Sequence, residues 1–416
     1  MSGALLIAEA AARAGGRRAP TALQRRLRDQ VVDRLARLCC GAIRLTDHAG
    51  ETLLGDPKGP LGTAPLVVHD PAFWTALVFG ADLAAGEGFV SGQWSSDDLV
   101  RLLQLFVRDR EVRQQVGRSP WSWPRRLLRR AGQLLRQNHR RGSERNIRDH
   151  YDLGDELFAH MLDPSMTYSS AWFEYEGQPL AAAQQHKLQR LGDLVDLGPG
   201  DHLLEIGTGW GSLALFAAGR GARVVTTTIS NNQFTTAQQR LAQSGLGDRV
   251  QLLRRDYRDL DGTFDKLLSC EMIEAVGARF LPTYLRTCAA RLRPGGLLGL
   301  QAITIQDRLY HGALRSVDYI KRHVFPGSFI PSVAAIVDAA ARHSDLQLEH
   351  YTDFGPHYAT TLCCWRERIT TAPEPFLRRG GPALLRAWVY YLAYCEAGFR
   401  ERQLGVGHFR FRRARA

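Results

Sequence analysis

A short apolar run that breaks into three alternating glycines constrains this chain most. Residues 203–206 are apolar except for Glu205, the glycines Gly207, Gly209 and Gly211 follow, and a second apolar-rich run covers residues 213–218. This pattern predicts a buried parallel strand, a tight turn and the start of a helix. Because glycine has no Cβ, a ligand can approach the backbone of the turn, and the free N–H groups at the helix start attract polar groups.

The spacing of the glycines narrows the choice of ligand. A dinucleotide-binding loop has the spacing G-x-G-x-x-G, whereas this chain has G-x-G-x-G after Glu205. The spacing favours S-adenosylmethionine over NAD. A tight strand-to-helix turn in another kind of doubly wound domain is the structural alternative.

Four further strand-like runs follow at residues 222–229, 250–253, 264–269 and 297–305, separated by stretches of helical length. Such alternation predicts an α/β fold with a parallel sheet covered on both faces. Ligands of such sheets lie beyond the carboxyl ends of the strands. The polar residues expected there to bind the cofactor, which also suit helix caps and turns, are Thr228, Ser230, Gln233, Asp256 and Tyr257.

Length and composition predict a globular protein of more than one domain. The chain has 416 residues, of which 44% are hydrophobic and 23% are charged. We expect an N-terminal α+β accessory domain over 1–116, a basic amphipathic linker over 117–145 and a larger domain over 146–416. The sequence shows no apolar run long enough to span a bilayer, no secretory signal and no cysteine spacing typical of a metal site, so we expect a cytoplasmic protein without a metal.

The positive charge is concentrated in one segment. Residues 118–148 contain ten arginines and the single acid Glu144, and leucine pairs recur there between arginines after Trp121 and Trp123. A basic amphipathic helix of this kind can bind an anionic membrane surface, which predicts peripheral association with the inner face of the membrane. A solvated linker helix is the alternative. Nucleic acid would also be attracted by the charge, but we expect none as a partner.

Five motifs, in order along the chain, carry a resemblance to a known family. They are HYDLG at 150–154, LDPSMTYSSA at 162–171, the glycine loop, EMIEAVG at 271–277 and FPGSFIPS at 325–332. Together they resemble the cyclopropane-fatty-acyl-phospholipid synthases from about residue 146 to 407, and GEGFVSGQW at 86–94 extends the resemblance upstream. The resemblance implies a Rossmann-like class I methyltransferase domain with a smaller N-terminal domain. It also implies methyl transfer from S-adenosylmethionine to a double bond in a phospholipid acyl chain.

The resemblance also implies roles for individual residues. Tyr168 and Ser169 match a pair that lines the cofactor pocket in the family. The family holds a bicarbonate ion that removes a proton from the transferred methyl group. By motif position, the surroundings of that ion in this chain are Ser170, Glu274, Gln301, Ile303 and Tyr358.

Two of these positions depart from the best-known members, since Ser170 replaces a cysteine and Gln301 replaces a histidine. Neither side chain titrates near neutral pH as histidine does, so the strength or placement of the base is expected to differ. A cyclopropane is the expected product. A methyl- or methylene-branched chain is the alternative, because slow proton loss would let the cation rearrange.

Other functions stay open at this point. One is a lipid- or nucleic-acid-binding protein that keeps a methyltransferase fold without turnover, and another is a methyltransferase for a small soluble substrate. The aromatic stretch at 388–394 is either a packed helix or a surface for self-association into a homodimer.

Overall fold

The computed structural model describes residues 19–112 and 154–415, which form two compact units. The basic segment at 118–148 and positions 150–153 of the first motif lie outside the described residues. Each unit joins segments that are far apart in the sequence. The described residues of unit 1 lie within Met1–Gly132, Val317–Val324 and Leu362–Gln403, and those of unit 2 lie within Gln133–Ser316, Phe325–Thr361 and Leu404–Ala416.

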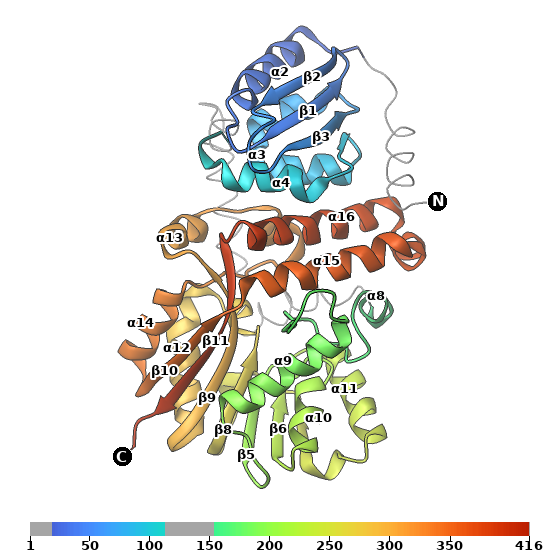
Figure 1. The fold of residues 1–416 in the computed structure, drawn as a ribbon. Helices are drawn as coiled ribbons and strands as arrows, with labels where there is room; N and C mark the ends of the chain where they lie inside the picture. The colour runs from blue at the N-terminus through green and yellow to red at the C-terminus, as the bar shows by residue number, and fades with distance from the viewer. Residues whose placement is uncertain (1–18, 113–153, 416) are drawn as a thin grey trace. The chain divides into compact units, whose positions relative to one another are not determined.

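Unit 1 is built on a four-stranded mixed sheet with the strand order β2-β1-β3-β4 (Figure 1). Strands β1 and β3 are parallel, and the other two pairs are antiparallel. Helix α2 begins with a capping box, in which the Thr21 hydroxyl and the Gln24 side chain each accept the other residue's backbone N–H. The elements are α2 (Ala22–Leu35), β1 (Ala42–Asp47), β2 (Gly50–Gly55), β3 (Thr63–Val68), α3 (Ala72–Val90), β4 (Trp94–Ser95) and α4 (Leu99–Arg108).

A long C-terminal helix, α16 (Glu374–Arg400), also belongs to unit 1, where it packs against α3 and α4. Its axis breaks at Gly380 and Gly381, which have non-helical dihedral angles. The aromatic stretch at 388–394 lies in this helix, and Trp388, Tyr390 and Tyr391 are buried. The packed-helix interpretation of the stretch therefore agrees with the structure.

The packing of α16 explains why the two units do not follow the predicted division at 116 and 146. Helix α16 buries its apolar face within unit 1, although it lies in the 146–416 segment of the sequence. The predicted domains remain a proposal about how the chain is organised.

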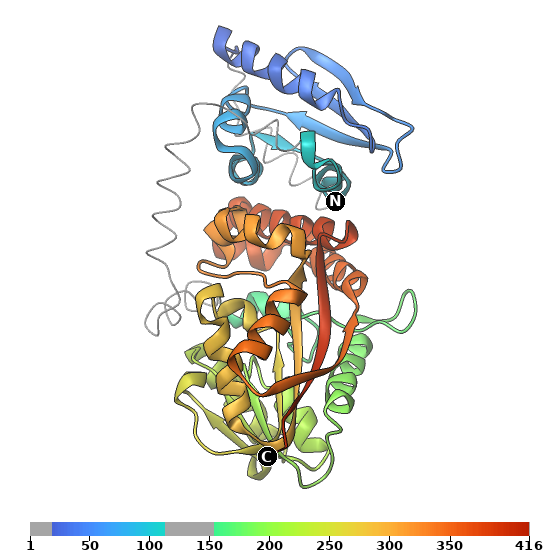
Figure 2. The ribbon, with the colours of Figure 1, turned by 90° about the vertical axis from the view of Figure 1, so that its left-hand side faces the viewer.

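Unit 2 contains a seven-stranded sheet with the strand order β10-β11-β9-β8-β5-β6-β7. Five neighbouring strands are parallel, whereas β11 runs antiparallel to both β9 and β10, as two perpendicular views show (Figures 1 and 2). The strands are β5 (His202–Ile206), β6 (Arg223–Thr227), β7 (Val250–Leu253), β8 (Phe264–Cys270), β9 (Leu292–Ile305), β10 (Leu346–Asp353) and β11 (Leu404–Arg413). The helices are α8 (Asp155–Met161), α9 (Leu180–Leu194), α10 (Ser212–Gly219), α11 (Asn231–Gln243), α12 (Leu281–Arg291), α13 (Asp307–Arg315), α14 (Val333–His343) and α15 (Gly355–Thr371), the last of which continues into unit 1.

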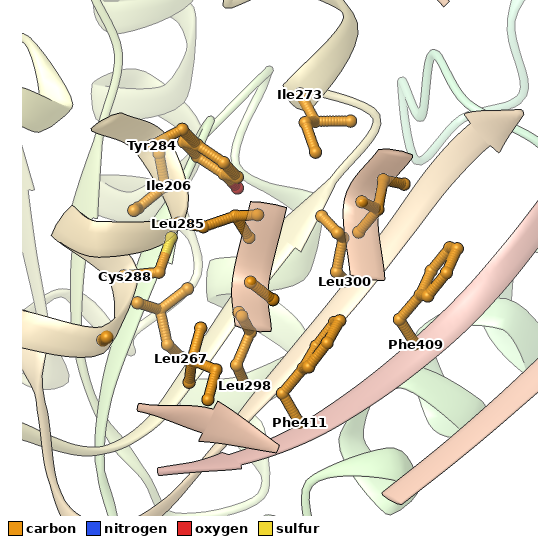
Figure 3. Packing of buried hydrophobic residues seen from close by; sticks show 14 of the residues in the cluster. Ile206, Leu267, Ile273, Tyr284, Leu285, Cys288, Leu298, Leu300, Phe409 and Phe411 are labelled. Atoms are coloured by element: carbon orange, nitrogen blue, oxygen red, sulfur yellow. The ribbon is translucent and has the colours of Figure 1, made fainter. Parts of the chain in front are cut away.

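Helices bury both faces of this sheet. Alternate residues of each strand point to opposite faces, so Leu204 and Leu267 join one hydrophobic cluster while Leu203 and Leu268 join the other. The first cluster includes residues of α12 and α14, and Figure 3 shows Tyr284, Leu285 and Cys288 of α12 beside the sheet residues. The second cluster includes residues of α9 and α10. The predicted α/β fold with a mostly parallel, doubly covered sheet is confirmed.

Within residues 19–112 and 154–415, no helix combines the length and the apolar character needed to cross a membrane.

Candidate active site

The cofactor loop, residues 207–211, joins β5 to α10. Gly207, Gly209 and Gly211 have φ angles of 101°, 54° and 92°, which are left-handed conformations that favour glycine. The backbone N–H groups of Gly207 and Thr208 both donate to Thr227 O at 3.1 Å, which ties the loop to the end of β6. A Cβ atom added at Gly209 would meet no atom of the described residues within 4 Å. The backbone at Gly209 therefore borders open space that a ligand can fill.

Glu205 lies in the strand just before this loop, and its side chain is inside the protein. The residue is 1% exposed, and its Oε2 accepts a hydrogen bond from the Thr226 hydroxyl at 2.5 Å. Thr226 Oγ1 is also 2.6 Å from Thr208 Oγ1. Burial raises the pKa of Glu205 to about 8, so the carboxyl is mostly protonated at neutral pH. Its hydrogen bonds join β5 to β6, and its predicted contact with the cofactor stays a prediction.

Three of the predicted cofactor residues form a hydrogen-bonded group at the start of α11. The Thr228 hydroxyl donates to Gln233 Oε1 at 2.9 Å, and the Ser230 hydroxyl caps the helix by accepting from Gln233 N at 3.3 Å. All three residues are buried. The cap that the sequence offered as an alternative is present, and the group also lies beyond the end of β6, where a ligand of the sheet is expected.

Asp256 and Tyr257 follow β7 at the start of a short 3-10 helix, Tyr257–Asp259. The Asp256 carboxylate pairs with the Arg258 guanidinium at 2.6 Å, and the Tyr257 ring packs edge-on against Tyr284 with centroids 5.4 Å apart. Burial raises the pKa of Tyr257, so its hydroxyl is neutral. These contacts fix both side chains near the edge of the sheet.

Tyr168 and Ser169 lie in the motif that precedes α9. The Tyr168 ring packs against Phe158 in an edge-on arrangement, with 5.3 Å between centroids. The Ser169 hydroxyl accepts a hydrogen bond from Lys187 Nζ at 2.9 Å, and Lys187 is only 1% exposed. A buried lysine was not among the predicted site residues, and it places a positive charge beside the predicted cofactor pair.

A carboxylate that the sequence interpretation did not assign lies at the centre of the predicted base site. Glu271 follows β8, and its Oε1 accepts from Ser170 N at 2.9 Å and from Gln301 Nε2 at 2.7 Å. Its Oε2 accepts from the Tyr358 hydroxyl at 2.8 Å. We call Ser170, Glu271, Glu274, Gln301 and Tyr358 the carboxylate cluster. The structure thus brings together three of the five predicted residues around Glu271.

The two remaining predicted residues contact each other. Glu274 Oε1 accepts from the backbone N–H of Ile303 at 2.5 Å. The other oxygen, Oε2, is buried and has no hydrogen-bond partner among the described residues. Burial, and then the charge of Glu271, raise the pKa of Glu274 to about 8. Glu274 is therefore mostly protonated at neutral pH.

Ser170 contacts Glu271 through its backbone and not through its hydroxyl. It donates to Ala171 O at 3.1 Å, whereas the backbone N–H of Ser170 faces Glu271. Because the backbone supplies the contact, serine and cysteine at this position offer the same donor to the carboxylate.

His408 of β11 orients Gln301 of β9, and the two residues are partners in the antiparallel ladder. His408 Nε2 is 2.9 Å from Gln301 Oε1, while Gln301 Nε2 contacts Ser170 O at 3.2 Å and Glu271. Burial lowers the pKa of His408 to about 3, so the ring is neutral, and Nε2 must carry the proton that Gln301 Oε1 accepts. The ring also stacks on Trp172 with centroids 5.5 Å apart.

Sequence reasoning missed Glu271, His408 and Lys187. Glu271 stands three positions before Glu274 in the motif and directly after the end of β8, and this position was its only signal. His408 lies 107 positions after Gln301, so the sequence gives no local sign of their contact.

The cofactor loop and the carboxylate cluster are neighbours. Strands β5 and β8 are adjacent and parallel, so Gly207 and Glu271 follow the same edge of the sheet. A Cβ added at Gly207 would lie 3.1 Å from the side chain of Met272, the residue after Glu271. A methyl donor on the loop and a proton acceptor in the cluster would therefore act in one region.

Comparisons with known proteins identify the family of the chain. Residues 138–409 match the family model described as mycolic acid cyclopropane synthetase. The chain is 39% identical to the tuberculostearic acid methyltransferase UfaA1 of Mycobacterium tuberculosis, over 84% of this chain and 83% of that protein. It is 32% identical to the cyclopropane-fatty-acyl-phospholipid synthase of Escherichia coli K12, over 85% of this chain and 89% of that protein.

A solved structure of a cyclopropane synthase is also similar to this chain. The mycolic acid cyclopropane synthase CmaA1 complexed with SAH and CTAB is similar with a TM-score of 0.61 and 26% identity, over 65% of this chain and 98% of that one. The resemblance found in the motifs is confirmed. The chain belongs to the cyclopropane synthase family and is an S-adenosylmethionine-dependent methyltransferase that acts on lipids.

Proposed function

We propose that this enzyme transfers a methyl or methylene group from S-adenosylmethionine to the double bond of an unsaturated acyl chain in a membrane phospholipid. One observation carries the proposal, namely that the carboxylate cluster lies beside the cofactor loop at the same edge of the sheet. Methylating a double bond produces a cation that must lose a proton, and this chemistry requires a base next to the methyl donor. The lipid substrates named for the relatives support the same choice.

The cofactor loop fits S-adenosylmethionine. The left-handed backbone at the three glycines and the open space at Gly209 leave room for the cofactor, which supplies an electrophilic methyl group on a positively charged sulfur. We propose that the cofactor is held by Tyr168, Ser169, Glu205, Gly207, Gly209, Gly211, Thr228, Ser230, Gln233, Asp256 and Tyr257.

The chain's own residues then position the substrate and receive the proton. A double bond is a weak nucleophile, so its alignment in a site that excludes water contributes most to the rate. An ionised Glu271 carboxylate would stabilise the positive charge that develops on the acyl chain. Protonated Glu274 adds no second negative charge that would repel Glu271.

The bicarbonate implied by the family resemblance does not fit the observed contacts. The donors at Ser170, Gln301 and Tyr358 are already used by the carboxylate of Glu271, and the N–H of Ile303 is used by Glu274.

Ring closure to a cyclopropane is the proposed product, through loss of a proton from the transferred methyl group. A methylene- or methyl-branched chain is the second candidate. The tuberculostearic acid methyltransferase favours this second candidate. Its sequence identity to the chain is 39%, which is higher than the 32% identity of the cyclopropane synthase over a similar share of the chain.

The test is to incubate the purified protein with labelled S-adenosylmethionine and vesicles of an unsaturated phospholipid. Label in the acyl chain is expected, and proton NMR separates the upfield ring protons of a cyclopropane from the vinylic protons of a methylene group. Label only in small soluble acceptors would contradict the proposal.

We also propose peripheral attachment to an anionic membrane through the arginines of residues 118–148. Vesicle binding should then weaken as salt rises and as anionic lipid is removed. Replacing Arg125, Arg126, Arg129 and Arg130 with glutamine should weaken it in the same way. Vesicle sedimentation that is insensitive to all three changes would favour the linker alternative.

A further inference from the structure

We infer that the side chain of Glu271 takes the place of a bound bicarbonate and is itself the proton acceptor of this enzyme. The inference rests on the proposed function, because it needs a cationic acyl chain from which a proton is lost. It adds a catalytic residue that belongs to the protein and makes turnover independent of an exogenous ion.

The contacts of Glu271 are those that a small planar anion would make. A backbone N–H from Ser170, an amide from Gln301 of β9 and a hydroxyl from Tyr358 of α15 converge on its two oxygens within 2.9 Å. These donors come from three separate segments of unit 2. A carboxylate and bicarbonate share the planar arrangement of two oxygens on one carbon, so the same donors suit both.

The backbone of Glu271 is held in an unfavourable conformation. Its φ angle is 50°, in the left-handed region that residues with a Cβ rarely adopt. Its N–H donates to Gln301 O at 2.8 Å, which fixes the residue beside β9. A glycine would relax this backbone, and a glutamate kept there in spite of the strain indicates that the side chain has a function.

The electrostatic surroundings suit a base. Burial raises the pKa of Glu271 above its ordinary value, which makes the carboxylate a stronger base than one in water. The three donors and the charge of Lys187 oppose that effect and favour the ionised form. Glu274 interacts electrostatically with Glu271, and with a pKa of about 8 it is mostly protonated at neutral pH.

The proton transfer to Glu271 follows methyl transfer. Methyl transfer has formed a C–C bond with the π electrons of the substrate and left a cation on the neighbouring carbon. A Glu271 oxygen removes a proton from the transferred methyl group, and the electron pair of the broken C–H bond forms the ring bond. If a hydride first moves from the methylated carbon to the cationic carbon, the electron pair of the methyl C–H bond forms a double bond instead, which gives a methylene group. Glu271 becomes a carboxylic acid and loses its proton to water after the product leaves.

The experiment measures turnover of the full chain on unsaturated phospholipid vesicles, in buffer freed of carbon dioxide and in buffer with added bicarbonate. The native enzyme should keep its rate within about twofold in both buffers. Glu271→Gln keeps the shape but cannot accept a proton, and it should lose about 100-fold or more in both. Glu271→Gly removes the carboxylate that the three donors contact, and added bicarbonate should restore its rate by about tenfold or more.

Two controls separate chemistry from folding. Arg402→Gly relaxes another left-handed residue, with φ 56°, at an exposed position in unit 1, and it should keep full turnover in both buffers. Calorimetry should give the same S-adenosylmethionine affinity for the native enzyme and both Glu271 variants.

Three outcomes would overturn the inference. The first is a native enzyme whose turnover is lost without bicarbonate and returns when bicarbonate is added. The second is a Glu271→Gln variant with full turnover. The third is a Glu271→Gly variant whose turnover bicarbonate does not restore. If no lipid is methylated by the native enzyme, the proposed function fails instead. Titration with ¹³C-bicarbonate then still tests the inference, because Glu271→Gly should bind the ion and the native protein should not. Equal binding by both would reject it.

Discussion

The cofactor loop and the carboxylate cluster lie at one edge of the same sheet, but different features hold them in shape. The loop depends on the dihedral angles of three glycines within five residues. In the cluster, Ser170 lies 101 positions before Glu271, and Tyr358 lies 87 positions after it. The loop should therefore be sensitive to a local change of backbone, whereas the cluster should be sensitive to distant side chains.

The largest effect is expected from Gly209→Val. A β-branched residue is strained at φ 54° and fills the open space beside the loop, so S-adenosylmethionine affinity should fall by about 100-fold or more. Gly245→Val is the matched control, since Gly245 has φ 70° and equally open surroundings after α11. Calorimetry should show normal affinity in the control. Equal affinity in both variants would contradict the claim that the backbone at Gly209 determines cofactor binding.

A change far from Glu271 in sequence should damage the cluster and spare the loop. His408→Leu removes the donor to Gln301 Oε1, so the amide is no longer held toward Glu271. The unsatisfied buried oxygen should cost about 1–3 kcal/mol of unfolding free energy. We expect kcat to fall about tenfold while the KM for S-adenosylmethionine stays unchanged.

Two further variants test whether this effect comes from the hydrogen bond. His408→Asn offers an amide donor and should recover part of the lost kcat. His350→Leu, on the exposed side of β10, should have native kinetics. An unaltered kcat in His408→Leu would show that Gln301 does not need its partner.

In the cofactor region, Glu205 should make stability depend on pH. Its pKa is about 8 in the folded protein and 4.5 ordinarily, so the folded state keeps a proton that the unfolded chain loses between these values. Stability from this group is complete below pH 4.5 and declines as pH rises to 8, by up to about 1.4 kcal/mol per pH unit. Urea unfolding at several pH values should show a shallower decline for Glu205→Gln. Identical slopes would contradict the raised pKa.

The smallest effect is expected from Thr226→Val, which keeps the shape of the strand residue and removes the hydroxyl that donates to Glu205. Unfolding free energy should fall by about 1 kcal/mol, because one buried hydrogen bond is lost. Turnover at saturating cofactor should stay native, since the cluster is untouched. A drop in kcat would show that the two regions are coupled more tightly than their contacts indicate.

The parallel part of the sheet was predictable because each strand carries its own signal. The run at 250–253 has the same bounds as β7, and the run at 264–269 differs from β8 by one residue. The antiparallel strands β10 and β11 were not predicted. Strand β11 lacks a continuous apolar run because charged residues such as Arg410 and Arg412 interrupt it. Its partner strand β9 also lies far away in sequence, so no local pattern indicates the pairing.

The site residues also fall into those that a local sequence pattern predicted and those that it did not. The glycines, and the group of Thr228, Ser230 and Gln233, could be found because they follow strand ends that the pattern marks. The residues around Glu271 were found only through the family resemblance, and the carboxylate that joins them was overlooked. Its role depends on which donors reach it, and those distances are set by the packing of β8, β9 and α15.

The pairing of His408 with Gln301 determines when this site can be completed during synthesis. The chain leaves unit 2 at Leu362, forms α16 in unit 1 and returns at Leu404 to add β11. A ribosome-bound chain that ends before residue 408 already contains the cofactor loop and Glu271, but it lacks the histidine that orients Gln301. Such a nascent chain should bind the methyl donor before it can catalyse efficient proton removal, so catalytic competence should arise only after β11 has been made and added to the sheet.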